Sequence, residues 1–394
     1  MPIEERVFIA GAGPVGLVAA ANLVRHGVPV TVFEAGDALA EESRASTFHP
    51  PTLDMLDKFG AAGPLIAQGL KAPQVQYRTR DGVIATFDFG AIADVTRHPF
   101  HVQAEQFKLT RILYERLAGR AGFRIEFGVK IANVEQDSAA VHVTVDRHGA
   151  TERRSGRWLI GADGARSEVR RALAIEFAGF TWPERFLVVS TPFDFRAVIA
   201  ELASVTYVAD PVRWHFLLEI PGSIWRVMFP LTETASDAEV LGRAFADRLM
   251  AGVVPGVASY EIAHTTLYKV HQRVAKSFRA GRVFLAGDAA HVNNPLGGMG
   301  MNGGIHDAVN LTERLAVVIA GAPEAEVDRY ERQRRAITLE YIEKQTIANK
   351  RNLECANPDF AATLKRTAAD PQLTRDYLLR LAMIASLRRA AELG

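Results

Sequence analysis

The first 34 residues carry the pattern that most restricts the fold of this chain. An apolar strand at Val7–Ala10 runs into the turn GAGPVG at 11–16, a helix follows over Leu17–His26, and a strand at Val30–Phe33 ends at Glu34. A strand, a GxGxxG turn, a helix and a second strand with a terminal acid form the βαβ fingerprint of a dinucleotide site. The chain is therefore predicted to contain a Rossmann-like α/β domain.

Each residue of this fingerprint has a physical role. Gly11 permits the tight turn, Gly13 lets the backbone approach a pyrophosphate, and Gly16 lets the helix pack closely on the strand. Glu34 is placed to accept hydrogen bonds from an adenosine ribose. The turn does not distinguish NAD from FAD, because both dinucleotides use the same cradle.

A second informative segment is 281–311. An apolar strand at Val283–Ala286 stops at Gly287–Asp288, so a carboxylate stands at the carboxyl end of the strand, where α/β sheets bind ligands. The loop 295–304 holds five glycines, and a helix is predicted from Ile305 onward. Such a loop and helix N-terminus favour a negatively charged ligand, although glycines needed only for close packing would give the same pattern.

A third segment, 158–170, repeats the placement of a carboxylate after a strand. Apolar residues lead to Ala162-Asp163-Gly164, and Ser167 is expected to cap a short helix. Two strand-end aspartates that are distant in sequence can converge on one ligand.

Composition narrows the function further. The chain has 394 residues, of which 48% are hydrophobic, and a net charge of +1, so no charge excess indicates nucleic acid or an anionic membrane as a partner. The single cysteine, Cys355, excludes an intrachain disulfide, and without CxxC or HExxH no metal site is predicted. Because the chain enters a strand within a few residues and has no long apolar run, we expect a soluble cytoplasmic protein.

Three motifs together resemble a known family. GAGPVG with Glu34, Ile160–Gly164 and Arg282–His291 are similar in order and separation to the signatures of the single-component FAD aromatic hydroxylases of the para-hydroxybenzoate hydroxylase type, the group A flavoprotein monooxygenases. The resemblance spans residues 5 to 350. It also accounts for the single GxGxxG, because this family has no separate domain for NAD(P)H.

The resemblance implies a fold class and a division into domains. The fold is expected to be α/β, with a Rossmann-like FAD-binding domain, a β-sheet substrate domain and a helical C-terminus. The expected boundaries are 1–178 for the FAD-binding domain with a β-excursion at 71–99, 179–268 for the substrate-binding sheet, 269–355 for the return to the FAD-binding domain, and 356–394 for the C-terminal helices.

The resemblance also implies which residues hold the cofactor. Gly11, Gly13, Gly16 and Glu34 would hold the ADP half of FAD, and Asp288 would bind the ribityl chain. The carbonyl of Pro295 would face the reactive side of the flavin. The remaining cofactor positions are Arg44 and Gln103, Asp163 in the motif implicated in FAD and NAD(P)H binding, and the backbone of Gly300, Met301 and Asn302 beside the pyrimidine end of the ring.

The implied activity is hydroxylation of an electron-rich aromatic ring. NADH or NADPH reduces FAD, O2 forms a flavin C4a-hydroperoxide, and one oxygen passes to a phenol, hydroxybenzoate or hydroxypyridine. A base or polarising group is needed near the substrate. Tyr207, His215 and Arg226 are the candidates on the substrate sheet. Strand alternation puts Arg226 on the face of Ile224 and Met228, and His215 on the face of Leu217 and Glu219. It does not decide which of these faces meets the flavin. The apolar Leu296 indicates a ring at its position.

Other functions stay open at this point. A flavoprotein halogenase or reductase would share the fold, although the halogenase WxWxIP motif is absent. An NAD-dependent Rossmann dehydrogenase would share the first motif, and a non-catalytic FAD-binding protein would share all three. The stripe Leu373, Tyr377, Leu381, Ile384 and Leu387 is expected to be core or a homodimer contact, and whether the chain dimerises is left open.

Overall fold

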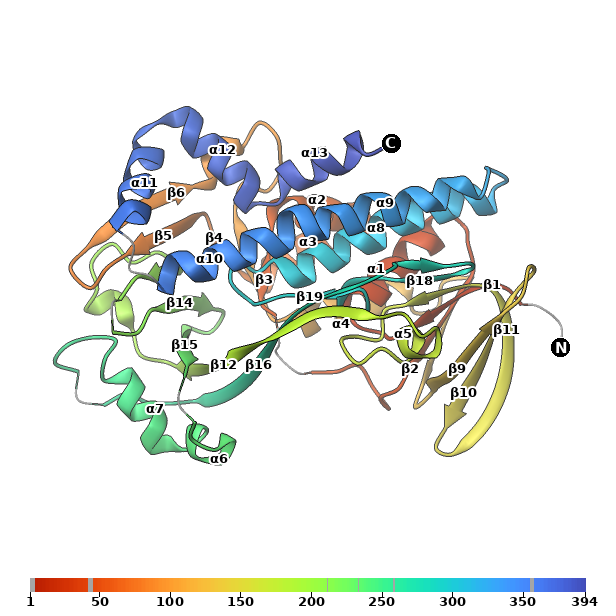
Figure 1. The fold of residues 1–394 in the computed structure, drawn as a ribbon, viewed down its shortest axis with the longest axis horizontal. Helices are drawn as coiled ribbons and strands as arrows, with labels where there is room; N and C mark the ends of the chain where they lie inside the picture. Colours follow the sequence, from red (N-terminus) through yellow and green to blue (C-terminus); the bar gives the residue numbers. More distant parts are fainter. Residues whose placement is uncertain (1–3, 42–44, 211, 233, 258, 355–357) are drawn as a thin grey trace.

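The structure is a computed structural model, and it describes residues 4–41, 45–210, 212–232, 234–257, 259–354 and 358–394. Two large sheets lie side by side, and long helices run along one side of both (Figure 1). Arg44 and Cys355 lie outside the described residues.

The first sheet is the Rossmann-like one. Its parallel strands β18, β11, β1, β2 and β8 are hydrogen-bonded in that order, β17 pairs antiparallel with β18, and β10 joins β9 to β11. The bounds are β1 (Glu4–Ala10), β2 (Val30–Glu34), β8 (Phe123–Phe127), β9 (Lys130–Gln136), β10 (Val141–Arg147), β11 (Ala150–Gly161), β17 (Arg279–Ala280) and β18 (Val283–Leu285).

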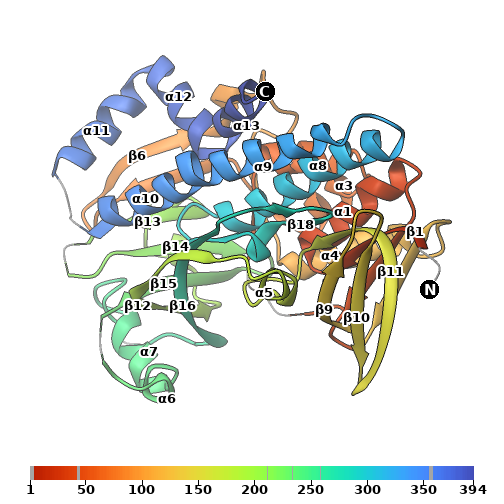
Figure 2. The same cartoon turned by 45° about the vertical axis from the view of Figure 1, so that its right-hand side comes forward.

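The second sheet contains the strands of the segment 179–268, which is expected to bind the substrate. The strand order is β19-β16-β12-β15-β14-β13-β5-β6, and the long strands β12 and β16 run together from the first sheet toward it (Figures 1 and 2). The bounds are β5 (Gln74–Arg78), β6 (Val83–Asp88), β12 (Phe177–Thr191), β13 (Val205–Val208), β14 (His215–Ile220), β15 (Ile224–Leu231), β16 (His264–Ala275) and β19 (His291–Val292).

A small third sheet lies where the two large sheets meet. Its strand β7 (His101–Gln103) pairs antiparallel with both β3 (Thr47–Phe48) and β4 (Leu70–Ala72). Between β4 and β7 the chain forms β5 and β6 of the second sheet and the short helix η1 (Phe89–Ile92). The segment 70–103 therefore contributes strands to two sheets.

The long helices α8–α10 and the C-terminal helices lie on one side of the sheets, and α6 and α7 lie on the other side of the second sheet (Figure 1). Helix α1 contacts α8 and α4, while α11 contacts β6 and α13 contacts α9. No helix among the described residues is long and apolar enough to cross a membrane. The bounds are α1 (Pro14–Arg25), α2 (Pro50–Asp57), α3 (Ala62–Ala67), α4 (Gln106–Leu117), α5 (Glu168–Ala172), α6 (Asp237–Val240), α7 (Arg243–Met250), α8 (Met299–Ile319), α9 (Ala325–Ile337), a π-helix (Thr338–Glu343), α10 (Lys344–Glu354), α11 (Pro358–Ala369), α12 (Pro371–Leu381) and α13 (Ile384–Glu392), with 3-10 turns η2 (Phe195–Ala197) and η3 (Gly287–Ala289).

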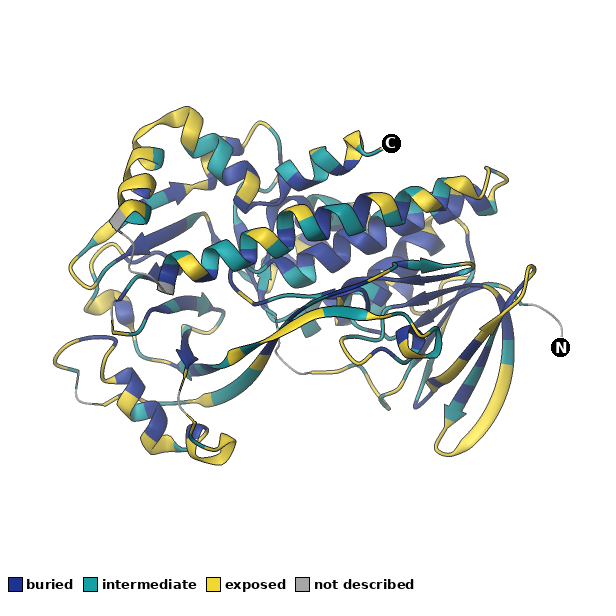
Figure 3. Ribbon diagram, viewed as in Figure 1, coloured by how far each residue is buried: buried dark blue, intermediate teal, exposed yellow. Residues whose placement is uncertain are grey.

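The buried side chains form one cluster for each layer. The largest surrounds the first sheet, a second lies between the second sheet and the C-terminal helices, and a third lies between the second sheet and α7. Figure 3 shows α8 buried along most of its length, whereas α11 and α12 expose one side. In the C-terminal stripe Leu381 and Ile384 are buried, but Leu373 is exposed.

One helix begins earlier than its sequence suggests. Helix α8 starts at Met299 rather than Ile305, so Asn302 lies in its first turn. Glycine permits this because a Cβ on Gly304 would lie 2.7 Å from Val15 Cγ2 and 2.9 Å from Gly287 Cα. The glycines of this segment therefore belong to both the loop and the helix.

Candidate active site

The three sequence motifs meet at one edge of the first sheet. Strand β11 pairs in parallel with β1 on one side and with β18 on the other, with Ile160 opposite both Ile9 and Phe284. The GAGPVG turn, Asp163 and Asp288 each follow the carboxyl end of one of these strands. This is the edge at which open α/β sheets bind ligands.

The glycines of the first turn divide into two kinds. Gly11 has a φ of +95°, and a Cβ there would lie 2.6 Å from the Ala162 carbonyl oxygen. A Cβ on Gly16 would lie 2.0 Å from the Gly11 carbonyl oxygen. Gly13 differs, because a Cβ there would meet no atom within 4 Å, and the helix α1 that it precedes has no side-chain cap. Gly13 thus borders open space beside free helix N–H groups, which suits a pyrophosphate.

Glu34 braces the same turn. One carboxylate oxygen accepts a hydrogen bond from the Ala12 N–H at 2.7 Å, and the other accepts from the Gly36 N–H at 2.9 Å. Each carboxylate oxygen can accept a further hydrogen bond, so a ribose hydroxyl remains compatible with these contacts.

Asp163 has one satisfied and one unsatisfied oxygen. Its Oδ2 accepts hydrogen bonds from the N–H groups of Glu168 at 2.8 Å and Val169 at 3.1 Å, at the start of α5. Its Oδ1 is buried and has no hydrogen-bond partner among the described residues. Burial raises the pKa of Asp163 above its ordinary value, although these hydrogen bonds oppose the shift. An unpaired buried oxygen is what a donor on a cofactor would satisfy.

Arg170 ties the second and third motifs together. Its buried guanidinium donates from Nη1 to the Ala289 carbonyl at 2.8 Å and from Nη2 to the Ala165 carbonyl at 2.8 Å. Asp288 lies between these elements in the turn η3 and is exposed to solvent. Arg170, which the sequence did not single out, therefore links the turn after β11 to the turn after β18.

The start of α8 is held by a polar clamp. Asn302 is fully buried, and its amide donates to the Thr47 carbonyl at 2.8 Å and the Gly298 carbonyl at 2.6 Å. Its Oδ1 accepts from the His49 N–H at 2.9 Å. Because no side chain caps α8 itself, the backbone N–H groups of Gly300 and Met301 in its first turn stay available to an anion.

The loop before α8 is fixed from two sides. Gly297 donates its N–H to the hydroxyl oxygen of Tyr207 at 3.1 Å, and its carbonyl lies 2.9 Å from His49 Nε2. A carbonyl only accepts, so His49 Nε2 carries the proton. Pro295 is exposed, and its carbonyl accepts the Gly298 N–H at 3.0 Å, which closes the turn. No local sequence pattern marks His49, because its partners lie about 250 residues away.

Gln103 presents an unpaired donor to this region. Its side chain is fully buried, and its Oε1 accepts from the Thr47 hydroxyl at 2.7 Å. Its Nε2 has no partner among the described residues. A buried amide nitrogen without an acceptor costs free energy unless a ligand or water pairs with it, so Gln103 fits the cofactor role expected of it.

The structure decides which face of the second sheet meets the loop. Tyr207 packs in the buried cluster that contains Leu296, and Arg226 shares its strand face with Met228 of that cluster. Arg226 Nη1 lies 3.3 Å from Ser46 Oγ. Burial lowers the pKa of the Arg226 guanidinium, and the nearby Tyr268 and Glu105 oppose that shift.

His215 lies on the opposite face, so its expected catalytic role is not carried forward. Its ring is 5.7 Å from that of Phe229, within the cluster covered by α7, and its Nδ1 is 3.2 Å from the Arg213 carbonyl. Burial lowers the pKa of His215, which therefore serves as a neutral core residue there.

Two further tyrosines adjoin Tyr207. Tyr77 stacks on Tyr207 with ring centroids 5.2 Å apart, and the hydroxyls of Tyr77 and Tyr377 are 2.9 Å apart. Burial raises the pKa of Tyr207 well above its ordinary value, so the phenol stays protonated. Tyr207 accepts from Gly297 and thus keeps its own O–H for another acceptor.

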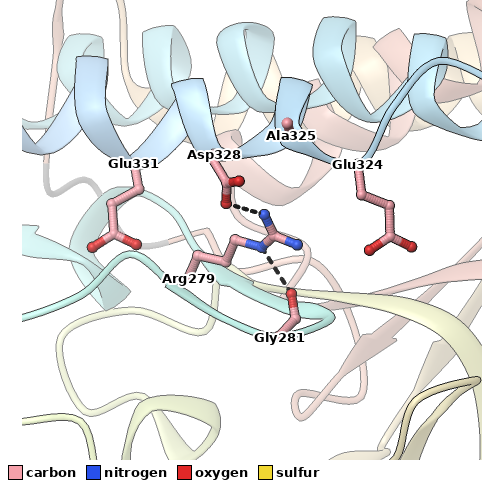
Figure 4. Close-up of a pocket in the computed structure, with 6 residues that line it drawn as sticks. All are labelled: Arg279, Gly281, Glu324, Ala325, Asp328 and Glu331. Atoms are coloured by element: carbon pink, nitrogen blue, oxygen red, sulfur yellow. Dashed lines mark hydrogen bonds and ion pairs between the residues drawn. The ribbon is translucent and has the colours of Figure 1, made fainter.

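Two other polar clusters are explained by protein contacts. The surface pocket in Figure 4 is occupied by Arg279, which is ion-paired with Asp328 and donates to the Gly281 carbonyl. Asp54, Asp57 and His98 offer metal-ligand atoms, but Asp54 accepts from Thr96 Oγ1 at 2.8 Å and His98 Nε2 lies 2.9 Å from Asp57 Oδ2. Neither cluster belongs to the site.

Comparison with known proteins agrees with this geometry. A family model described as FAD binding domain matches residues 4–345. The para-nitrophenol 4-monooxygenase of Pseudomonas sp. (strain WBC-3) is 34% identical over 97% of this chain and 96% of its own length. The 6-hydroxy-3-succinoylpyridine 3-monooxygenase HspB of Pseudomonas putida (strain DSM 28022 / S16) is 33% identical over 96% of this chain and 98% of its own.

A solved structure shows the same arrangement of elements. The crystal structure of p-nitrophenol 4-monooxygenase PnpA from Pseudomonas putida DLL-E4 superposes with a TM-score of 0.91, at 31% identity, over 97% of this chain and 99% of that one. The chain belongs to the FAD-binding family described above. It is an FAD-dependent monooxygenase of the aromatic hydroxylase class, and the halogenase, reductase and dehydrogenase alternatives are not supported.

Proposed function

We propose that this monooxygenase hydroxylates a phenol or hydroxypyridine ring with NADH or NADPH and O2 as co-substrates. The observation that carries the proposal is the meeting of two surfaces at Gly297. One is the loop that leads into α8, the segment proposed to contact the cofactor, and the other is the tyrosine-lined face of the second sheet. The relatives named for p-nitrophenol and a hydroxypyridine support this substrate class.

The residues present fit FAD. Gly11, Gly13 and Gly16 would hold the pyrophosphate at α1, with Glu34 toward the ribose. Gln103 Nε2 and Asp163 Oδ1 are buried and have no partner within the described ranges, so they would gain one from the bound cofactor. The other positions proposed to contact it are Asp288 and the backbone of Gly300, Met301 and Asn302 at the start of α8. When bound, FAD supplies the transfer of electrons from NAD(P)H and the activation of O2.

On the substrate side, the chain offers an apolar wall and one protonated hydroxyl. Leu296 and the aromatic cluster around Tyr77 and Tyr207 exclude water from a ring placed there. The Tyr207 O–H would donate a hydrogen bond to the hydroxyl oxygen on the substrate ring and stabilise that oxygen when it loses its proton. Arg226, on the same face, would favour the ionised form of a phenolic substrate.

The test is consumption of NADH and NADPH against a panel of nitrophenols, hydroxybenzoates and hydroxypyridines, with peroxide measured alongside. The proposal predicts that one class stimulates oxidation and yields a hydroxylated product with little peroxide. Oxidation that yields only peroxide with every compound would contradict it. The same assay decides between NADH and NADPH. We also propose a cytoplasmic location, a possible homodimer and the domain boundaries given above.

A further inference from the structure

His101 is a buried histidine whose ring nitrogens have no hydrogen-bond partner in the part of the chain that the structure describes. The side chain is 3% exposed, and neither Nδ1 nor Nε2 makes a hydrogen bond among the described residues. Most buried polar groups in folded proteins are paired, because an unpaired one loses its hydration without compensation. A polar partner, from a ligand or a water molecule, is therefore expected beside this ring.

The sheet geometry places His101 beside the cofactor-facing residues. In the small sheet Gln103 of β7 is opposite Thr47 of β3, and alternation puts His101 on the same side of β7 as Gln103. His49, directly after β3, stacks on His101 with ring centroids 4.4 Å apart. His101 thus continues the row of polar side chains that includes the unpaired Gln103 amide.

The His101 ring also contacts the buried cluster that contains Tyr207. Phe89 packs on this ring with centroids 4.4 Å apart, and Phe89 belongs to the buried cluster that contains Leu296 and Tyr207. His101 therefore lies at the border between the cofactor-facing row and the aromatic cluster, where the substrate ring is expected.

We propose that His101 is a substrate-binding residue, and that its ring hydrogen-bonds an uncharged polar substituent of the hydroxyarene, a hydroxyl, nitro or carbonyl group. This inference rests on the proposed function. A neutral imidazole offers one N–H donor and one acceptor nitrogen, so it pairs with either a nitro oxygen or a hydroxyl.

The charge at this position favours a neutral substituent. Burial lowers the pKa of His101 well below its ordinary value, and the nearby His49 lowers it further. Burial also lowers the pKa of His49 to about 4, against the effect of the Gly297 and Leu381 carbonyls. Both rings in the pair are therefore uncharged near neutral pH, so neither ring supplies an opposite charge for a carboxylate placed against it.

The experiment compares three variants of the FAD-loaded protein without NAD(P)H, by equilibrium dialysis at pH 6, where 4-nitrophenol is mainly protonated. 4-Nitrophenol and 2-hydroxypyridine are the uncharged probes, and 4-hydroxybenzoate is the anionic one. His101→Phe keeps a ring between His49 and Phe89 but removes both nitrogens, whereas His101→Gln keeps a donor and an acceptor. His142→Phe is the matched control, because this half-buried histidine bonds Ser155 and Asp137 on the far sheet.

The proposal predicts that His101→Phe weakens binding of an uncharged probe about 10-fold, as the loss of one buried hydrogen bond should. His101→Gln restores most of the affinity, the control binds as the wild type does, and all variants keep their FAD and their melting temperature. The anionic probe binds weakly to every protein.

Two results would overturn the assignment of His101 alone. Unchanged binding in His101→Phe would mean that a buried water satisfies the ring, and loss of FAD with unchanged probe affinity would place His101 in the cofactor site. A wild-type protein that binds FAD but none of the probes would instead overturn the proposed function together with this inference.

Discussion

The hydroxyl of Tyr207, on strand β13 of the second sheet, accepts a hydrogen bond from the N–H of Gly297, in the loop that leads into α8. This bond joins the proposed substrate side to the proposed cofactor side through one peptide group. Since Gly297 has a φ of +96°, only glycine adopts its conformation without strain. A change at Tyr207 is therefore expected to affect turnover through both the substrate and the loop.

Replacing Tyr207 by Phe should lower kcat/KM by at least about 10-fold while FAD occupancy stays unchanged, because the substrate loses its donor and Gly297 loses its acceptor. Steady-state kinetics and the flavin-to-protein ratio measure the two effects. Tyr260→Phe is the matched control, since Tyr260 lies on the opposite face of the sheet and its buried hydroxyl has no hydrogen-bond partner in the described part of the chain. Equal kinetics for the two variants would remove Tyr207 from the site.

The second and third glycines of the first turn should respond differently to alanine. Gly13→Ala should fold normally, because its Cβ meets nothing in the protein, but it should lose FAD because the methyl group occupies the space beside the helix N-terminus. Gly16→Ala should lower the stability of the apoprotein itself, since its Cβ would lie 2.0 Å from the Gly11 carbonyl. Melting temperatures of the apoproteins and FAD titrations separate the outcomes. Full FAD binding by Gly13→Ala would mean that the cofactor does not reach this turn.

A buried ion pair between α8 and α9 should contribute to the stability of the fold. Asp307 accepts from Arg334 Nε at 2.6 Å and lies 2.7 Å from His291 Nε2, and both charged side chains are almost fully buried. Asp307→Asn leaves the Arg334 charge unpaired, so it should reduce the free energy of unfolding by about 3–5 kcal/mol. Urea denaturation measures this loss. Arg375→Met, which breaks the surface pair with Asp94, should stay close to the wild type.

The pH dependence of that pair has a definite sign. Burial raises the pKa of Asp307, but His291 and Arg334 outweigh it, so the folded-state pKa lies well below the ordinary value of 3.8. The pair therefore stabilises the fold above pH 3.8, and this contribution is lost as the pH falls through the folded-state pKa. The difference between Asp307→Asn and the wild type should narrow in acid, and a constant difference would show that the charge is not the cause.

Asp163 should show the opposite sign in the apoprotein. Burial raises its pKa above 3.8, so its ionisation costs stability as the pH rises through that folded-state pKa. Asp163→Asn should leave the apoprotein as stable as the wild type or more stable at neutral pH, with the difference shrinking toward acid, while FAD binding weakens. Thermal unfolding of both apoproteins at neutral and acid pH tests this. A less stable variant at neutral pH would contradict the expected role of the carboxylate.

The sequence predicted the parts of the site that depend on neighbouring residues. Strand, turn and terminal acid are local patterns, so Gly11, Asp163 and Asp288 could be placed at strand ends, and the parallel pairing of β1, β11 and β18 then brings them together. The two-residue period of a strand also predicted that Arg226 shares a face with Met228 and that His215 shares a face with Leu217. It could not predict that α7 covers one of those faces, because that depends on packing across the chain.

The missed residues are those whose partners lie far away in sequence. His49 and Asn302 are 253 positions apart, and His101 has no local motif that marks it as functional. The start of α8 was placed too late because glycines usually signal a loop, whereas here close packing against Val15 and Gly287 requires them inside the helix. Burial and unpaired atoms, which only the structure shows, identify these positions.

The central claim is that the protein inserts one oxygen atom from O2 into an aromatic ring. The most direct measurement is turnover of the stimulating hydroxyarene under ¹⁸O₂ with NAD(P)H, followed by mass spectrometry of the product. The account predicts a hydroxylated product that carries one ¹⁸O atom. A product whose new oxygen comes from water, or NAD(P)H consumption with unaltered substrate for every compound in the panel, would contradict it.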